Sequence, residues 1–391
     1  MSKAIGWRTR RLLAGACIAA PGVAAAQQET ALGGDSSRVP SRGAPPVRPD
    51  TVKPDTSIRV QNTSIISPIV FYAPETGWGG GGGLVYVRMA AGDARTQRPS
   101  TYQVSLVGTE RMQVTLQALG DIWTSNNTNR FNYEIVAQQA PGKFFGIGPN
   151  TPETSEKYTP INARLILTGQ HRMARHFFMG ARYFLERSTL KDVTAGPLIS
   201  GSVPGQQGWW LTTLSGVTTY DSRDRYYSPL HGVYATLQFT RADRAIGSEF
   251  AYWRLVTDVR WYRALIGEHV VALQFYMDDA WKGTPPFERM PRLGGQNILR
   301  GFFGGRFRDN HAMAFQGEYR TPEWWKLAAV AFIGTGGVAP SQNLYDARTF
   351  RTGYGVGLRW AITHPDRLNL RIDHGWGPGS SGTYFTVGEA F

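Results

Sequence analysis

The sequence has almost no cysteine, few charged residues and no long apolar run. Its only cysteine, Cys17, lies in residues 1–26, where a basic start, an apolar run and small residues predict a secretory signal peptide cleaved after Ala26. A chain cleaved there has no thiol, which excludes a disulfide framework and a cysteine-ligated metal site. After residue 26, no apolar run reaches the ~18 residues that a transmembrane helix needs. The sequence therefore predicts an exported protein without a membrane-spanning helix.

Glycine, aromatic residues and positive charge are what the sequence does have. Its 46 glycines and 12% aromatic residues, against only 18% charged residues, are typical of an outer-membrane β-barrel or of a secreted β-sandwich. The formal net charge of +13 favours an acidic partner such as lipopolysaccharide or an anion-attracting cavity, but a basic surface without a ligand gives the same balance. Residues 27–63 are rich in proline, serine and charge, which predicts a flexible periplasmic tail before one folded domain over 64–391.

Apolar and polar residues alternate from Ser64 onward. Val104 and Leu106 fall on one face, and Gln103 and Ser105 fall on the other. Charges recur on the polar face of strand after strand, which suits a barrel with lipid outside and a polar lumen better than a soluble sandwich. We therefore predict an all-β fold, a 16-stranded antiparallel transmembrane β-barrel, with strands at 64–74, 80–90, 100–108, 111–120, 131–140, 160–170, 175–187, 209–221, 231–242, 249–263, 268–279, 311–321, 326–336, 350–362, 367–376 and 383–391.

The connections between these strands differ in length. Those after even-numbered strands include the short turns 266–267 and 322–323, and those after odd-numbered strands include the long segments 141–159, 188–208 and 280–310. In outer-membrane barrels the short turns lie in the periplasm and the long loops lie outside. Both chain ends are therefore expected on the periplasmic side.

The longest loop contains the stretch PRLGGQNILRGFFGGRFRDN, residues 291–310. Together with SPIVFYAPETGWGGGGG, TTYDSRDRYYSPLHGVY and the terminal YFTVGEAF, it resembles the Omp85 superfamily, specifically the bacterial surface antigen (D15) barrels of the BamA and TamA type, over most of residues 66–391. The most specific match is the loop motif Arg300, Gly301 and Phe302. The resemblance implies a loop, at 280–310, that inserts into the barrel and brings Arg300 to acidic residues of the inner wall.

The acidic partner of Arg300 departs from the family pattern. The family commonly has an aspartate in a Phe-x-Asp-x-Gly pattern after the loop, whereas this chain has Gly334 at that place. Glu318 and Asp373 lie on polar faces and are the candidate partners, although each could instead pair with a neighbouring lumen arginine. The wall that faces the loop is expected to be a face without side chains, unless its glycines mark barrel curvature instead. Its residues are Gly353, Gly355 and Gly357.

Two functions are consistent with these features. The resemblance implies insertion or translocation of membrane proteins, or gated transport, by a barrel with a weak seam between its first and last strands. The family's assembly factors receive clients through N-terminal POTRA domains, and 27–63 is too short for one, so the resemblance is to barrel-only members. The alternative is a passive, anion-preferring, porin-like channel, which inward arginines favour. The expected lumen charges are Arg164, Arg182, Arg254, Asp258, Arg260 and Arg359.

No chemistry-bearing motif stands out. No histidine has metal-ligand spacing beside a carboxylate and no Gly-x-Ser-x-Gly occurs, so we expect no enzyme activity, cofactor, metal or nucleic-acid partner. We expect a bacterial outer-membrane location. The expected partners are outer-membrane lipid, lipopolysaccharide, the barrel-assembly machinery during biogenesis and client membrane proteins. Phe391 is expected to end the last strand as an assembly signal, with Phe385 and Val387 on the same face and Glu389 interrupting the alternation.

Overall fold

The computed structural model describes residues 63–88, 100–194, 196–197, 200–362 and 368–391. The expected signal peptide and all but the last residue of the expected tail lie outside these ranges. Within them, no helix is long and apolar enough to cross a membrane.

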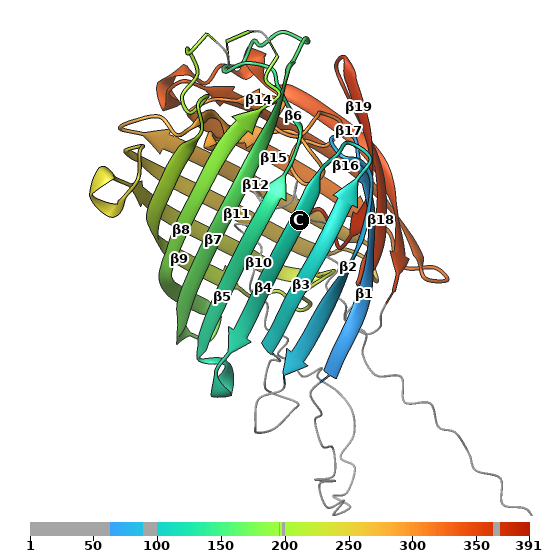
Figure 1. Cartoon of the computed structure of the whole chain (residues 1–391). Coiled ribbons are helices and arrows are strands. Elements are labelled where there is room, and N and C mark those ends of the chain that lie inside the picture. Colours follow the sequence, from blue (N-terminus) through green and yellow to red (C-terminus); the bar gives the residue numbers. More distant parts are fainter. Residues whose placement is uncertain (1–62, 89–99, 195, 198–199, 363–367) are drawn as a thin grey trace, which may run out of the picture.

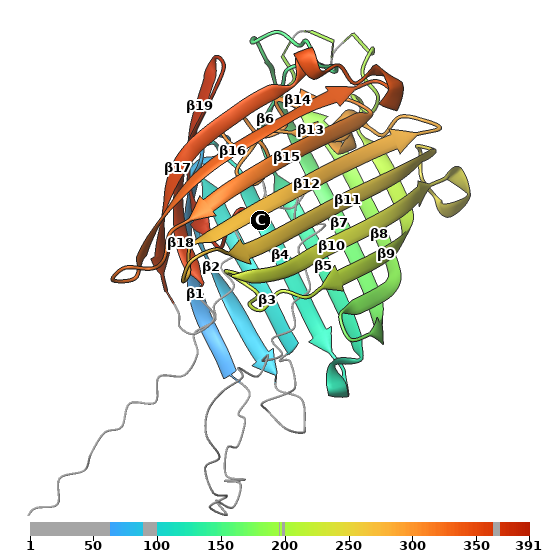
Figure 2. The ribbon, with the colours of Figure 1, turned by 180° about the vertical axis from the view of Figure 1, so that it is seen from behind.

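Sixteen antiparallel strands close into a barrel. Figures 1 and 2 show this barrel from opposite sides. This confirms the predicted fold class. The barrel strands are β1 (Thr63–Ala73), β2 (Gly77–Arg88), β3 (Ser100–Thr109), β4 (Val114–Trp123), β5 (Asn129–Gln139), β7 (Glu156–Ala174), β8 (Phe177–Lys191), β9 (Trp209–Asp221), β10 (His231–Ala242), β11 (Tyr252–Ala264), β12 (Val270–Trp281), β15 (His311–Arg320), β16 (Leu327–Ala339), β17 (Arg351–Ala361), β18 (Asn369–Gly377) and β19 (Ser380–Val387). The short strand β6 (Gly142–Phe144) is not one of the sixteen; it pairs with the first residues of β7, Glu156 to Tyr158.

The period of two separates a lipid face from a lumen face. On β3, Leu106 is 56% exposed on the outside, whereas the neighbouring Ser105 is buried inside. Because every backbone group inside a membrane must be paired, the alternation only works in a closed sheet. At the β15–β16 turn Trp324 and Trp325 project outward, 78% and 88% exposed, as the aromatic belt of a barrel does at the membrane surface.

The barrel closes where β19 meets β1. The register of that closure is a single pair, Tyr72 with Phe385. By contrast, β1 pairs with β2 along its whole length, from Thr63 to Ala73. On the outside, the ring of Trp78 lies 5.3 Å from that of Tyr72 and 6.1 Å from that of Phe385. The seam is therefore joined by little backbone pairing, with aromatic side chains over it.

The end of the chain corrects one prediction. We expected Phe391 to end the last strand on the face of Phe385 and Val387, but β19 ends at Val387 and Phe391 is buried inside, next to Tyr262. Gly388 adopts a left-handed φ of 90° that turns the chain inward, and Figures 1 and 2 both place the C-terminus within the barrel outline. The chain turns inward because the charged carboxylate of Glu389 is costly to expose to lipid, whereas in the lumen it pairs with Arg359.

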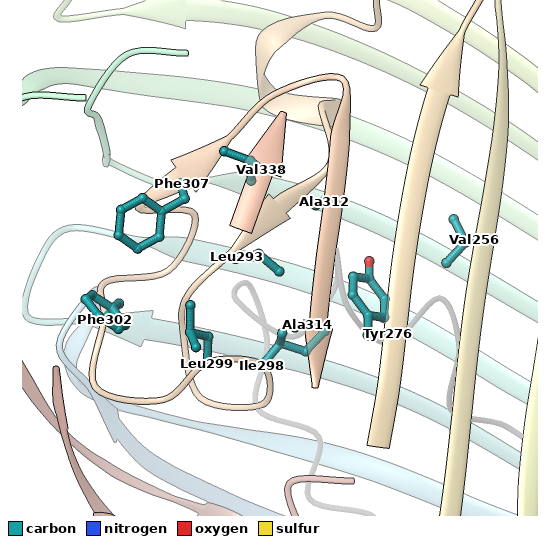
Figure 3. Close-up of a cluster of buried hydrophobic side chains, with 10 residues drawn as sticks. All are labelled: Val256, Tyr276, Leu293, Ile298, Leu299, Phe302, Phe307, Ala312, Ala314 and Val338. Carbon is teal, nitrogen blue, oxygen red and sulfur yellow. The ribbon is translucent and has the colours of Figure 1, made fainter. Parts of the chain in front are cut away.

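The lumen is occupied by the loop between β12 and β15. Apolar residues of this loop pack against small and apolar side chains of the inner wall (Figure 3). The loop contains the 3-10 turn η5 (Phe287–Arg289) and a two-stranded ribbon of β13 (Arg292–Leu293) and β14 (Phe307–Arg308). The cluster consists of Leu293, Ile298, Leu299, Phe302 and Phe307 from the loop with Val256, Tyr276, Ala312, Ala314 and Val338 from the wall. The loop thus has a core of its own inside the barrel.

Candidate functional site

The tip of the inserted loop turns on residues with left-handed backbone. Gly301 has φ 102° and Gly305 has φ 68°, conformations that favour glycine. Gly304, between them, has no positive φ. Leu299 adopts φ 55° although it carries a side chain, and that side chain is fully buried in the loop core. The packing of Leu299 therefore holds a strained backbone immediately before Arg300.

Arg300 reaches two acidic side chains of the barrel wall. Its Nη1 lies 2.5 Å from Oδ2 of Asp373 on β18, and its Nη2 bonds Oε1 of Glu318 on β15. The guanidinium carbon lies 3.6 Å from the ring centre of Phe332 on β16, a cation–π contact. All three charged side chains are buried. The loop is thus bound to two non-adjacent strands through one arginine, and both candidate partners from the sequence contact it.

Further charges surround these three. Arg320 lies 2.8 Å from Glu318, Arg359 lies 2.6 Å from Asp373, and Arg371 Nε lies 3.6 Å from Asp373. Glu389, from the inward-turned C-terminus, lies 2.7 Å from Arg359. Each contact offsets part of the large free energy of burying a charge. We call these side chains the luminal charge cluster: Arg300, Arg320, Arg359, Arg371, Glu318, Asp373 and Glu389.

Gly334 replaces the family's aspartate without leaving a polar gap. Gln316 on the adjacent strand β15 fills the space: a Cβ added at Gly334 would lie 3.1 Å from its Oε1. That oxygen accepts the backbone N–H of Leu299 at 2.8 Å, and the amide nitrogen of Gln316 donates to the carbonyl of Asn297 at 2.9 Å. A neutral amide therefore holds the loop where the family pattern has a carboxylate. Nothing in the sequence marked Gln316 for this role.

The expected glycine wall is only partly the surface on which the loop lies. Gly353 touches the backbone of Arg300, whereas Gly355 lies against Phe332 and Gly357 lies against Asp373. Two further glycines, Gly375 and Gly377 on β18, complete the contact surface.

A Cβ at Gly375 would lie 2.8 Å from the backbone nitrogen of Gly301, and one at Gly377 would meet the ring of Phe302. The signal that could have found these glycines is their period of two with Asp373 in the stretch Asp-His-Gly-Trp-Gly.

The loop also bonds both sides of the barrel seam. The backbone N–H of Gly304 donates to Glu75, which lies in the turn between β1 and β2. Tyr384 on β19 accepts the N–H of Gly301 at 3.3 Å and donates to the carbonyl of Phe302 at 3.2 Å. Because β1 and β19 share a single pair, the loop bridges the two strands from the lumen side.

A barrel of this strand number with an inserted Arg-Gly-Phe loop can be compared with known families. A family model described as the Omp85 superfamily domain matches residues 107–391. The chain belongs to the Omp85 superfamily. This Omp85 barrel lies in the bacterial outer membrane, as the family match indicates. No curated protein matches the sequence closely enough to be counted.

Solved structures with a similar fold include BamA from Haemophilus ducreyi lacking POTRA domains 1–3, with a TM-score of 0.59 and 15% identity over 84% of this chain and 70% of that one. CdiB from Acinetobacter baumannii gives a TM-score of 0.51 and 13% identity over 83% of this chain and 59% of that one. CdiB from Escherichia coli gives a TM-score of 0.52 and 13% identity over 82% of this chain and 62% of that one. The chain therefore spans less than two thirds of either CdiB chain, and at these identities the likeness concerns the fold alone.

The expected lumen charges of this Omp85 barrel all face inward, and most are paired. Arg164 lies 2.6 Å from Glu134, Arg254 lies 2.7 Å from Asp278, and Arg260 lies 2.6 Å from Asp258. Arg359 belongs to the luminal charge cluster, and Arg182 is buried on β8. Pairing removes most of the attraction that free arginines exert on small anions. In the ranges that the structure describes, no group of three or more histidines, cysteines or carboxylates is placed to hold a metal ion.

Proposed function

We propose that this Omp85 barrel inserts or translocates polypeptides at the outer membrane through the seam between β1 and β19. The observation that carries the proposal is the closure by one residue pair, Tyr72 with Phe385. Each missing ladder hydrogen bond leaves an edge group that an incoming strand can pair with. The inserted loop, bonded to Glu75 on one side and Tyr384 on the other, holds the seam closed until a client engages it.

The glycine run beside the seam supports the same function. Gly79–Gly83 of β2 pair with Ser67–Phe71 of β1. On the inner face the ring of Phe71 covers Gly79, but on the lipid face Gly80 and Gly82 offer β1 no side chain. Because cross-strand side-chain contacts stabilise a sheet, β1 is held there mainly by backbone hydrogen bonds. The β1–β2 hairpin can therefore bend at the glycine run at small energetic cost, which lets β1 move away from β19 while its ladder with β2 stays paired.

The alternative, a passive and anion-preferring channel, has less support. It was favoured by inward arginines, and Arg164, Arg254 and Arg260 each have a carboxylate partner. The inserted loop also packs an apolar cluster against the inner wall and so fills part of the lumen that an open pore would leave to water. Removal of residues 296–308 tests the loop as an obstruction, because conductance in planar bilayers should then rise.

A disulfide across the seam tests the proposal directly. Tyr72→Cys with Phe385→Cys joins the one paired position, and no other thiol interferes because Cys17 is the only cysteine in the sequence. The oxidised protein, reconstituted in lipid vesicles, should insert an unfolded outer-membrane barrel client no faster than vesicles alone. Reduction should restore insertion.

The matched control is Ile66→Cys with Leu84→Cys, an outward-facing pair inside the continuous β1–β2 ladder. Its oxidation should leave insertion unchanged, because that interface does not open. If the seam disulfide has no effect on insertion while a steady anion-selective conductance persists in the oxidised protein, the passive channel is the better description.

A further inference from the structure

Two arginines of the inserted loop lie opposite each other, and neither is ion-paired with a carboxylate among the residues that the structure describes. In the ribbon of β13 and β14, Arg292 is the direct partner of Arg308. Directly opposed residues of an antiparallel ribbon project from the same face, so the two side chains lie together. Both side chains also lie beside Gly305, because a Cβ added there would be 3.2 Å from Nη2 of Arg308 and 3.3 Å from Cδ of Arg292. Like charges in this arrangement destabilise a ribbon unless something negative lies between them.

Neither guanidinium forms an ion pair with a carboxylate in the described part of the chain, although Glu288 is near enough to act on both electrostatically. Arg308 is buried; it donates at 3.2 Å to the carbonyls of Phe287 and Gly305, and its Nε has no acceptor there. Arg292 makes no hydrogen bond to any residue that the structure describes. Arg289, three residues earlier, lies 2.6 Å from Glu186, so a nearby arginine of the same loop has the partner that these two lack. Burial, together with Arg308 and Arg289, lowers the pKa of Arg292 to about 10.

A cavity adjoins the pair in the half of the lumen toward the long loops. Its volume is about 120 Å³, against the roughly 10–15 Å³ that a cavity needs to hold one water, so it has room for an oxyanion of phosphate size. Arg292, Arg308 and Lys143 line it. The two carboxyls that also line it are Glu75 and Glu288.

Those two carboxyls are poor substitutes for a bound anion. Glu75 accepts the backbone N–H of Gly304, and Glu288 accepts the hydroxyl of Ser188 at 2.8 Å. Burial raises the pKa of both groups, and it raises that of Glu288 to about 7. A carboxyl with that pKa carries only about half a negative charge at neutral pH. The cavity thus keeps a strong positive potential.

We propose that this cavity binds a phosphate group or phosphate monoester, gripped between the guanidiniums of Arg292 and Arg308 with Lys143 at its side. Two guanidiniums and an ammonium match the charge and the several oxygens of a phosphate dianion better than those of a single carboxylate. The group could be a free anion or the headgroup of a lipid whose phosphate reaches the lumen. The site shares Glu75 and Gly304 with the bridge across the seam, but anion binding is measured apart from insertion, so either proposal can fail without the other.

Calorimetric titration of the purified full-length mature protein, in an uncharged detergent, tests the site. Inorganic phosphate at constant ionic strength should bind saturably, and Arg292→Gln should weaken binding about tenfold or more, as expected for loss of a charge-assisted contact. The matched control is Arg306→Gln, in the same loop, because Arg306 bonds Thr151 and does not line the cavity. Its affinity should stay at the wild-type value. Arg292→Lys, which keeps the charge, should recover part of the lost affinity.

A second pair of titrations separates the two sources of phosphate. Phosphatidic acid in the micelles presents a monoester headgroup, and phosphatidylglycerol presents a diester on the same chains. Arg292-dependent binding of phosphatidic acid without binding of inorganic phosphate assigns the site to a lipid headgroup, and the reverse assigns it to a free anion. The proposal is overturned if neither probe binds saturably to folded, heat-modifiable protein, or if Arg306→Gln weakens binding as much as Arg292→Gln.

Discussion

Asp373, rather than the motif arginine, should be the side chain on which the inserted loop most depends. The luminal charge cluster contains four arginines and three carboxylates, a net charge of +1. Arg300→Ala brings the cluster to neutrality, whereas Asp373→Asn raises it to +2. The first change leaves Glu318 with Arg320 and Asp373 with Arg359, so no carboxylate is stranded. The second change removes the only carboxylate within 4 Å of Arg371 among the described residues.

The magnitudes follow from what each substitution leaves behind. Loss of Arg300 removes two charge-assisted hydrogen bonds, each worth about 1.5 to 3 kcal/mol, and a cation–π contact with Phe332, but it strands no carboxylate. Loss of the Asp373 carboxylate also removes two such bonds, to Arg300 and Arg359, and in addition strands buried positive charge, which typically destabilises a protein by about 3 to 5 kcal/mol. We therefore expect Asp373→Asn to lower the free energy of unfolding more than Arg300→Ala does, although Arg300 carries the family motif.

Urea unfolding of the protein in detergent micelles measures the free energy, and Ile298→Cys reports release of the loop. Ile298 is buried in the loop core, so a cysteine there should react with a bulky thiol reagent only when the loop leaves the lumen. Reaction should be slow in the parent, faster with Arg300→Ala and fastest with Asp373→Asn. If Arg300→Ala proves more destabilising than Asp373→Asn, or frees the loop more readily, the balance of charge does not govern the cluster.

Gly375→Ala should destabilise the barrel by about 1 to 3 kcal/mol and speed thiol labelling of the Ile298→Cys reporter, because the new methyl group overlaps the backbone of Gly301. The control Gly216→Ala has open space at that position and should change neither the stability nor the labelling rate. Burial raises the pKa of Glu288 from 4.5 to about 7, so between pH 4.5 and pH 7 the folded state holds a proton that the unfolded state has lost. The free energy of unfolding should therefore fall by up to about 3 kcal/mol as the pH rises across that range. Glu288→Gln should remove this pH dependence of the free energy of unfolding measured by urea titration. An unchanged dependence in the variant would contradict the assignment to Glu288. Deletion of Phe391 should leave protein degraded or aggregated in the periplasm, since its ring packs against Tyr262 and Arg320 donates to its backbone oxygen at 2.9 Å; normal heat-modifiable barrel in the outer membrane would argue otherwise.

The barrel was predictable because its physics is local. A strand that separates lipid from a lumen must alternate residue by residue, so the strands β9 and β10 have the predicted bounds, 209–221 and 231–242. The same parity placed Glu318 and Asp373 on the lumen face, from which both contact Arg300. Local pattern therefore gave both the fold and the side chains that face the loop.

What the sequence did not give depends on contacts between distant segments. The inward turn after Val387 requires Glu389 to find Arg359, 30 residues away, and no period within the last strand encodes that. Gln316 acquires its role only because Gly334 on the next strand leaves room for it. The opposition of Arg292 and Arg308 arises from a two-residue ribbon, which is too short to leave an alternation in the sequence.

The contacts of the loop tip link the charge cluster to the seam. Arg300, Gly301, Phe302 and Gly304 are adjacent in sequence, so displacement of Arg300 from Glu318 and Asp373 also moves the backbone groups that meet Tyr384 and Glu75. Those two residues stand on opposite sides of a closure that has only one residue pair of its own. A change that frees the arginine therefore weakens the bridge across the seam, and a strand that parts β1 from β19 pulls the loop tip in two directions. The buried ion pairs of the lumen thus act on the one interface of the barrel that its hydrogen-bond ladder leaves weak.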